Sequence, residues 1–143
     1  KLFGVYEHRV LKPSSPLFRG FDDVFHAPHS RYTEVLEKDV RAAPGLELIA
    51  TSSEAGVYAV KTEDSRQFFI MGHPEYDSDT LAREYWRDVE KGLQIAVPAH
   101  YFPNDDPSQV PIVRWRSAGQ LLYTNWLNYY VYQTTPYDLA KLV

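Results

Sequence analysis

The chain of 143 residues contains no cysteine. This absence excludes a disulfide framework and a zinc site with thiolate ligands, and it says little about the cellular compartment. It also means that these residues supply no thiol nucleophile. Any thiol chemistry would need a residue from outside this chain.

The sequence also lacks a long apolar run and a cluster of basic residues. A membrane-spanning helix needs roughly 20 consecutive apolar residues. The formal net charge of −4 and the pI near 5.7 argue against a nucleic-acid-binding surface, which usually shows a clustered basic face. We therefore expect no nucleic-acid partner and no membrane partner.

Length and composition fit one globular domain with a real core. The hydrophobic content of 44% and the aromatic content of 15% are globular values. The first eight residues are strand-like, have no initiator methionine and lack the pattern of a secretory signal. We therefore expect a fragment or a processed piece of a longer protein.

Apolar patterns and turn residues predict alternating strands and helices. Strands are expected over residues 3–11, 46–50, 57–61 and 67–71, and helices over residues 34–43, 77–91 and 117–133. The stretches 18–31 and 98–111 show no clear periodicity and are predicted as loops.

Helix ends and helix faces give finer expectations. Thr33 should cap the first helix, and Asp77 or Ser78 should cap the second. Three apolar residues of the second helix recur every four positions and should face the sheet: Leu81, Tyr85 and Val89.

The segment 67–77 carries the strongest functional signal. Its bulky apolar residues, typical of a buried strand, end at Gly72 and are followed by His73 and Glu75. Open α/β sheets build their sites outside the carboxyl ends of strands, and a histidine beside a carboxylate there suits a general base with an orienting acid. The alternative is a surface histidine and a glutamate that only complements the N-terminus of the next helix.

Two arginines lie one turn apart on the helix that follows. Arg83 or Arg87 could hold a carboxylate with the two-pronged geometry of a guanidinium, which would anchor an acidic substrate. The pattern by itself favours a solvated charged face, in which Arg87 pairs with Glu84 or Glu90.

The stretch 18–31 contains side chains that can bind a metal: Asp22, Asp23, His26 and His29. Two histidines three positions apart, without a third ligand at fixed spacing, are a weak zinc signature, so we predict no metal site. Ser30 follows His29, but adjacent side chains rarely form a nucleophile and its base. Ser30 is therefore predicted to be a hydrogen-bonding group.

The last predicted helix is rich in aromatic residues: Trp126, Tyr129, Tyr130 and Tyr132. Without a basic groove, these residues indicate core or packing surface more than a stacking platform for nucleic-acid bases. Any that are exposed would indicate a subunit interface.

At residues 72–77, Gly-His-Pro-Glu-Tyr-Asp, the sequence resembles the homoserine O-acyltransferase family, the succinyl- and acetyl-transferring enzymes of methionine biosynthesis. The resemblance covers essentially the whole chain, but only the carboxyl-terminal half of the family. It extends over Lys1–His8, Arg19–Asp23, Ala27–Tyr32, Val97–Phe102, Trp115–Ser117 and Thr124–Tyr137.

The resemblance implies an α/β fold with a flavodoxin-like sheet and helices on both faces, like the class I glutamine amidotransferases. Only the carboxyl-terminal part of that fold would be present. Residues 1–143 would be the carboxyl-terminal portion of a single catalytic domain.

The resemblance also implies roles for particular residues. His73 and Glu75 match the histidine and glutamate of a Cys–His–Glu triad whose cysteine lies outside this chain. Lys1, Ser30 and Arg87 match substrate-binding positions, with Arg87 on the homoserine carboxylate. Arg83 has no such implied role and stays structural.

The implied reaction transfers an acetyl or succinyl group from acyl-CoA to the hydroxyl of L-homoserine. Acyl-CoA would be a co-substrate, with no further cofactor, and the choice of donor stays open. The implied protein is a cytoplasmic homodimer that includes the amino-terminal half missing here.

Two alternatives remain open. A glutaminase of the amidotransferase type would share the His-Pro-Glu segment, and the chain could also be a non-catalytic fragment or interaction module. In every case we expect the isolated chain to be inactive.

Overall fold

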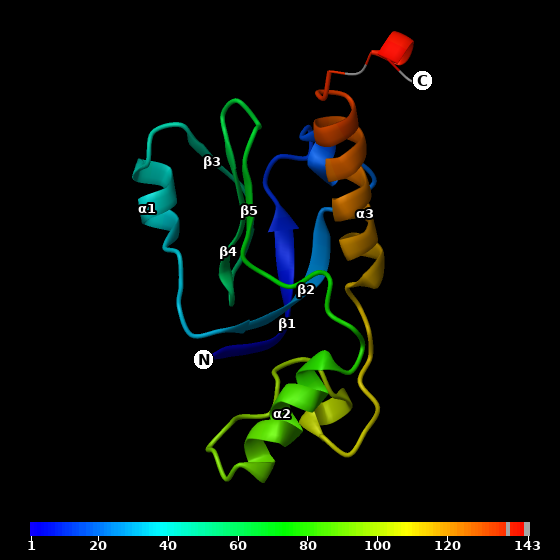
Figure 1. The fold of residues 1–143 in the computed structure, drawn as a ribbon. Coiled ribbons are helices and arrows are strands. Elements are labelled where there is room, and N and C mark those ends of the chain that lie inside the picture. The colour runs from blue at the N-terminus through cyan, green and yellow to red at the C-terminus, as the bar shows by residue number, and fades with distance from the viewer. Residues whose placement is uncertain (137, 142–143) are drawn as a thin grey trace.

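The computed structural model describes residues 1–136 and 138–141 (Figure 1). In this part of the chain, five strands form one sheet in the order β2-β1-β3-β4-β5, with every neighbouring pair antiparallel. The strands are β1 (Leu2–Val10), β2 (Val24–Arg31), β3 (Leu46–Ser52), β4 (Gly56–Thr62) and β5 (Phe68–Ile70). The helices are α1 (Glu37–Ala42), α2 (Thr80–Glu90) and α3 (Arg116–Trp126), which continues as a π-helix over Leu127–Tyr132. Short 3₁₀ turns lie at Pro16–Phe18, Pro103–Asp105 and Leu139–Lys141.

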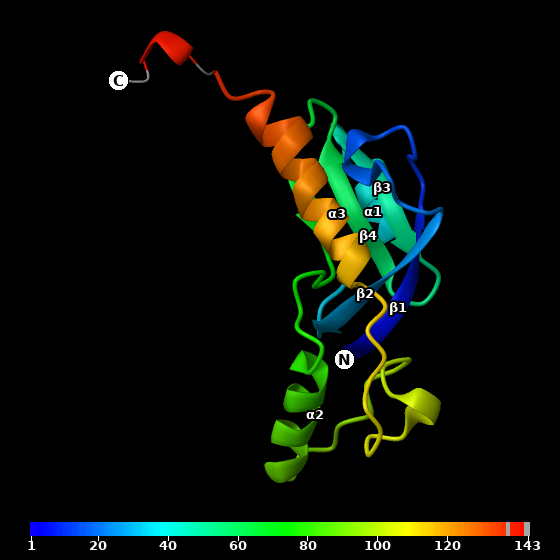
Figure 2. The same ribbon diagram turned by 90° about the vertical axis from the view of Figure 1, so that its right-hand side faces the viewer.

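Helices cover both faces of the sheet (Figures 1 and 2). On one face, Val40 of α1 is buried with Leu48 and Val57 of the sheet. On the other face, Leu122 of α3 is buried with Ile49. Burial of these apolar side chains is the main driving force for the layered arrangement. The predicted α/β class with helices on both faces is confirmed.

α2 lies beyond the end of the sheet where β1 begins (Figure 2). Leu81 is buried in a separate cluster with Phe3 and Tyr101, and Tyr85 packs against that cluster. Val89, predicted to face the sheet, keeps 38% of its surface exposed. That prediction is wrong because the buried face of α2 runs from Leu81 to Asp88, seven positions later, and Val89 lies at the margin of that face. None of the helices in the described residues has the length and apolar character that crossing a membrane requires.

β2 lies within the stretch that was predicted as a loop. It pairs with β1 without a break from Val24 to Arg31. Pro28 and the polar residue His29 are both fully buried inside it, so the usual alternation of apolar and polar residues is absent. Continuous pairing with β1 overrides this weak local signal.

The predicted helix caps are wrong. α1 begins after Leu36 and α2 after Asp79, and neither side chain forms a capping hydrogen bond. Both helices therefore start later than their cap-forming residues suggest: Thr33, Asp77 and Ser78.

Of the aromatic residues at the end of α3, some pack against the rest of the protein and others are exposed. The Tyr130 ring lies edge-on to the Phe68 ring, with centroids 4.6 Å apart. The Tyr129 hydroxyl accepts a hydrogen bond from Arg19. Trp126 and Tyr132 are exposed. The helix is therefore only partly a core element.

Candidate active site

His73 and Glu75 lie together just past the end of β5. The Nδ1 atom of His73 is 2.9 Å from Oε1 of Glu75, and both side chains reach solvent. When Nδ1 carries the proton and donates it to the carboxylate, Nε2 is unprotonated and can accept a proton. The structure thus brings together the two residues predicted as an acid–base pair. We call them the His73–Glu75 corner.

Gly72 allows the backbone before His73 to pack closely against neighbouring strands. A Cβ atom at this position would lie 2.8 Å from Cε2 of Tyr58 and 3.1 Å from the carbonyl oxygen of Pro28. The backbone N–H of His73 donates to that same carbonyl over 2.8 Å. The corner is therefore positioned by backbone contact with β2, where any larger residue would push it away.

α3 supports the other side of the corner. A Cβ atom on Gly119 would lie 2.5 Å from the carbonyl oxygen of Pro74, so glycine lets the helix approach this close. The Tyr123 hydroxyl faces Oε2 of Glu75 at 3.5 Å, which is long for a hydrogen bond. A pocket of about 270 Å³ opens here between the corner and α3, with Arg116 in its wall.

Tyr76 connects the corner to a second group of polar residues. Its ring stacks on the His73 imidazole, with centroids 4.3 Å apart and planes 10° from parallel. Its hydroxyl donates to Oε1 of Glu84 over 3.2 Å. Burial, and then the nearby Glu84 carboxylate, raise the pKa of Tyr76 to about 12. The hydroxyl therefore remains a hydrogen-bond donor at neutral pH.

The three predicted substrate-binding residues gather around Glu84 and Asp88 of α2. Ser30 donates from Oγ to Oε2 of Glu84 over 2.6 Å. The Lys1 ammonium lies 3.6 Å from the same oxygen and 3.9 Å from Oδ2 of Asp88. Arg87 contacts Oδ1 of Asp88 through Nε and Nη2, each at 2.7 Å. We call these five residues the Glu84–Asp88 network.

The network balances two cations against two carboxylates. The ion pair raises the pKa of Arg87 and lowers that of Asp88, in each case mainly through their shared hydrogen bond. Asp88 is nearly buried at 9% exposure, whereas Arg87 keeps 53% of its side chain exposed. A guanidinium carries five N–H donors, so Arg87 can bind a ligand on its solvent side while Asp88 orients it.

Two details of α2 differ from the pattern in the sequence. Arg87 pairs with its neighbour Asp88 and not along the helix with Glu84 or Glu90. Sequence reasoning missed Glu84 and Asp88 as site residues, although their spacing of four places both on one helical face. Arg83 pairs with Asp79 at 3.3 Å and takes no part in the network.

The residues considered as metal ligands do not converge. His29 points into the core, where its Nε2 lies 2.9 Å from Nε2 of His8. Burial, chiefly, lowers the pKa of His8 to about 3 and that of His29 to about 4, so both rings are neutral at pH 7. Residues 1–136 and 138–141 contain no group of three or more potential ligands. Because histidine is polar, the sequence pattern did not indicate that His8 and His29 are buried against each other.

Comparisons with known proteins give a consistent result. The chain matches the family model described as homoserine O-succinyltransferase over residues 1–137. It is 58% identical over 139 residues to the homoserine O-acetyltransferase of Brevibacillus brevis, covering 97% of this chain and 45% of that protein. It is 54% identical over 142 residues to the homoserine O-succinyltransferase of Pseudoalteromonas atlantica, covering 99% and 46%. The chain therefore spans a little under half the length of these relatives.

A solved structure supports the fold alone. The crystal structure of SMU.1228c is similar with a TM-score of 0.57 and 15% sequence identity, covering 87% of this chain and 50% of that one.

Proposed function

The chain belongs to the homoserine O-succinyltransferase family, and we propose that the full-length protein transfers an acyl group from acyl-CoA to the hydroxyl of L-homoserine. Residues 1–143 would be the carboxyl-terminal portion of its single catalytic domain. The observation that carries the proposal is the 2.9 Å contact between His73 and Glu75 at the solvent-exposed end of β5. It occurs in a chain whose relatives are named as homoserine acyltransferases.

The first half-reaction would use a cysteine from the rest of the protein. Its thiol attacks the thioester carbonyl carbon while Nε2 of His73 accepts the thiol proton. The carbon–sulfur bond of the donor then breaks, His73 returns the proton to the departing sulfur, and CoA leaves as a thiol. An acyl-enzyme remains. Glu75 would fix the His73 tautomer and stabilise the imidazolium.

The second half-reaction would pass the acyl group to homoserine. The homoserine hydroxyl attacks the acyl carbon as His73 accepts its proton, and the cysteine leaves and regains a proton from His73. O-acylhomoserine is released. Two stages that share one covalent intermediate predict ping-pong kinetics.

The Glu84–Asp88 network suits a zwitterion such as homoserine. The exposed face of Arg87 would bind the carboxylate in two parallel hydrogen bonds, while Asp88 holds the guanidinium in place. The Glu84 carboxylate provides a counter-charge for the ammonium group. Tyr76 joins Glu84 to the His73 ring, so a homoserine bound here would lie next to the proposed base.

Other properties of the full-length protein follow from the same proposal. It would act in methionine biosynthesis in the cytoplasm as a homodimer, with acyl-CoA as co-substrate and no further cofactor. The isolated 143 residues should be inactive because they contain no cysteine.

Assays of the full-length protein test the proposal. With homoserine and either acetyl-CoA or succinyl-CoA, we expect O-acylhomoserine and free CoA thiol in equal amounts. Intersecting initial-rate patterns would contradict the acyl-enzyme. Release of ammonia from glutamine without any acylation of homoserine would favour the glutaminase alternative.

A further inference from the structure

A pocket separate from the corner and from the network lies between α3 and the start of β2. Its volume of about 350 Å³ falls within the range of about 300–1,000 Å³ that is typical of small-molecule sites. The side chains that give it chemical character are Phe21, Asp22, Phe25, His26, Arg114 and Ser117. We call it the His26–Arg114 pocket.

Two aromatic rings form the apolar part of this pocket. The rings of Phe21 and Phe25 are nearly perpendicular, with centroids 5.1 Å apart. Phe25 is buried against the His8 ring, whereas Phe21 is only half-buried. Flat heterocycles such as nucleobases stack on aromatic side chains of this kind. The pocket therefore offers a surface for an aromatic ligand.

The polar part of the pocket indicates a ligand that carries negative charge. Burial, and then the charge of Arg114, lower the pKa of His26, and the Glu7 carboxylate offsets only part of that second effect. In residues 1–136 and 138–141, neither Arg114 nor His26 forms an ion pair. The hydroxyl of Ser117 lies in the same wall. A guanidinium beside an imidazole and a hydroxyl suits a phosphate group, which a guanidinium can bind with two parallel hydrogen bonds.

Asp22 makes the pocket more selective than a site for inorganic phosphate. It is an exposed carboxylate in the wall, so it repels a bare anion but accepts hydrogen bonds from hydroxyl and amino groups. Aromatic rings, a cation and an acceptor together match the base, the phosphate and the ribose of a phosphorylated nucleoside.

Trp115 fixes this pocket and the corner on two sides of the beginning of α3. It is 1% exposed, and its Nε1 donates to the Tyr76 carbonyl over 2.9 Å. Its neighbour Arg114 lines the His26–Arg114 pocket, and its other neighbour Arg116 lines the pocket beside the corner. An α-helix is roughly 10 Å across, and the extended pantetheine arm of CoA is longer than that. One acyl-CoA molecule can therefore reach both pockets.

We propose that the His26–Arg114 pocket binds the phosphorylated adenosine of acyl-CoA, with Arg114 on its 3′-phosphate, while the thioester reaches His73. The inference rests on the proposed function and deepens it, because it assigns the nucleotide end of the donor to residues of this chain.

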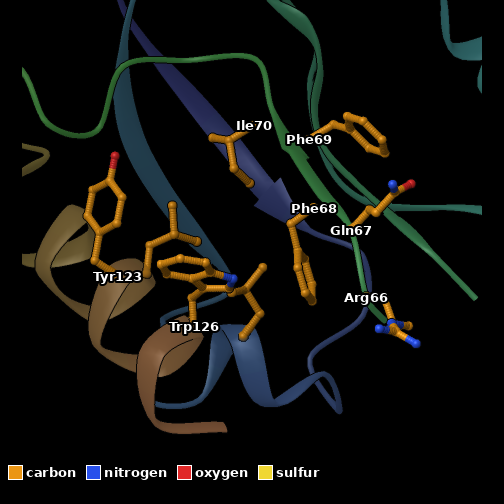
Figure 3. A pocket seen from close by; sticks show the side chains of 9 residues that line it. Arg66, Gln67, Phe68, Phe69, Ile70, Tyr123 and Trp126 are labelled. Atoms are coloured by element: carbon orange, nitrogen blue, oxygen red, sulfur yellow. The ribbon is translucent and has the colours of Figure 1, made fainter. Parts of the chain in front are cut away.

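The competing location for the nucleotide is a larger groove of about 470 Å³ between β5 and α3 (Figure 3). Phe68 and Ile70 of β5 and Trp126 of α3 make its wall largely apolar. Among the described residues that line it, Arg66 alone is cationic. Arg66→Ala is therefore the matched control for Arg114→Ala, since each change removes one exposed guanidinium from one pocket.

Calorimetric titration of the full-length protein with adenosine 3′,5′-bisphosphate tests the site without turnover. We expect the wild-type protein and Arg66→Ala to bind this nucleotide equally well. Arg114→Ala should bind it at least about tenfold more weakly, because the charge-assisted hydrogen bonds to the phosphate are lost. No binding to the wild-type protein, equal affinity in all three proteins, or a loss confined to Arg66→Ala would overturn the inference.

Kinetics with two acyl donors test which group Arg114 binds. The second donor is the dephospho-CoA thioester, which lacks the 3′-phosphate. In the wild-type protein and in Arg66→Ala, KM for this donor should be at least about tenfold higher than for acyl-CoA, with kcat unchanged. In Arg114→Ala the two donors should have the same KM, because the phosphate has lost its partner.

The outcomes separate this inference from the proposed function. A preference for the phosphorylated donor that survives in Arg114→Ala would overturn the inference and leave the acyl transfer itself intact. Absence of acyl transfer from either donor in the wild-type protein would contradict the proposed function, and the inference with it.

Discussion

The His73–Glu75 corner and the Glu84–Asp88 network are built in opposite ways. The corner comes from three consecutive residues and is held by close backbone packing, with glycines at positions 72 and 119. The network comes from Lys1, from β2 and from α2, and it is held by hydrogen bonds and ion pairs between side chains. The geometry of the corner therefore depends on the path of the backbone. The geometry of the network depends on the identity of the side chains that form it.

The largest expected effect separates the corner from an ordinary histidine–carboxylate pair. In the full-length enzyme, His73→Ala should lower kcat by about 10²–10⁴, because acid–base assistance is lost. His100 provides a matched control, since its Nε2 lies 3.0 Å from Oε2 of Glu54 in a similarly exposed pair. His100→Ala should leave kcat near the wild-type value. An equal loss of kcat in both variants would show that the His73–Glu75 corner has no catalytic role beyond that of an ordinary exposed pair.

The second prediction concerns the histidine pair behind the corner. The folded-state pKa values of about 3 for His8 and about 4 for His29 lie below the ordinary value of 6.5. Protons therefore bind preferentially to the unfolded state. The contribution of the two neutral rings to the free energy of unfolding should be complete above pH 6.5. It should decrease as the pH drops toward 4, by about 1.4 kcal/mol per pH unit for each histidine.

Urea unfolding of the full-length protein across pH 4–7 measures this slope. Arg31 adds to the cost of charging both rings, and His73 adds to the cost for His29. His8→Phe should make the dependence less steep, because only one of the two depressed groups remains. A stability that does not change between pH 6.5 and 4.5 would contradict the buried neutral pair.

A smaller effect is expected where α3 meets the corner. Gly119→Ala places a methyl group 2.5 Å from the Pro74 carbonyl, so α3 must shift. Overpacking of this kind costs about 1–3 kcal/mol of stability, and kcat should fall as the corner moves. Gln120→Ala, at the exposed neighbouring position, is the control for helix content. Unchanged melting temperature and kcat in Gly119→Ala would mean that this contact does not position the corner.

The smallest effect tests the network. Arg87→Lys keeps the charge but loses the two-pronged donor geometry, so KM for homoserine should rise by about tenfold while kcat changes little. Arg83→Lys, one turn away and paired with Asp79, should leave KM unchanged. If both variants change KM for homoserine by the same factor, the charge of α2 matters and the two-pronged donor geometry of Arg87 does not.

The same contrast explains how much the sequence predicts. β1, β3, β4 and β5 were predictable because apolar runs and turn residues mark them locally, and the nearness of His73 to Glu75 follows from their spacing. β2 was not, since Pro28 and His29 mask its pattern and its strand state depends on β1.

The network was only partly predictable. The resemblance pointed to Lys1, Ser30 and Arg87, but nothing local indicated that they meet at Glu84 and Asp88. Their convergence depends on how β2 and α2 pack in three dimensions. The His8–His29 contact is equally non-local, which is why long-range polar partners escape reasoning from patterns.

Trapping the acyl-enzyme tests the central claim most directly. Full-length protein mixed with acyl-CoA in the absence of homoserine is analysed by intact mass and peptide mapping, alongside His73→Ala. The account predicts one acyl group on a cysteine outside residues 1–143, with formation slowed by about 10²–10⁴ in the variant. An acyl group on a residue of this chain, or equally fast acylation without the imidazole, would contradict it.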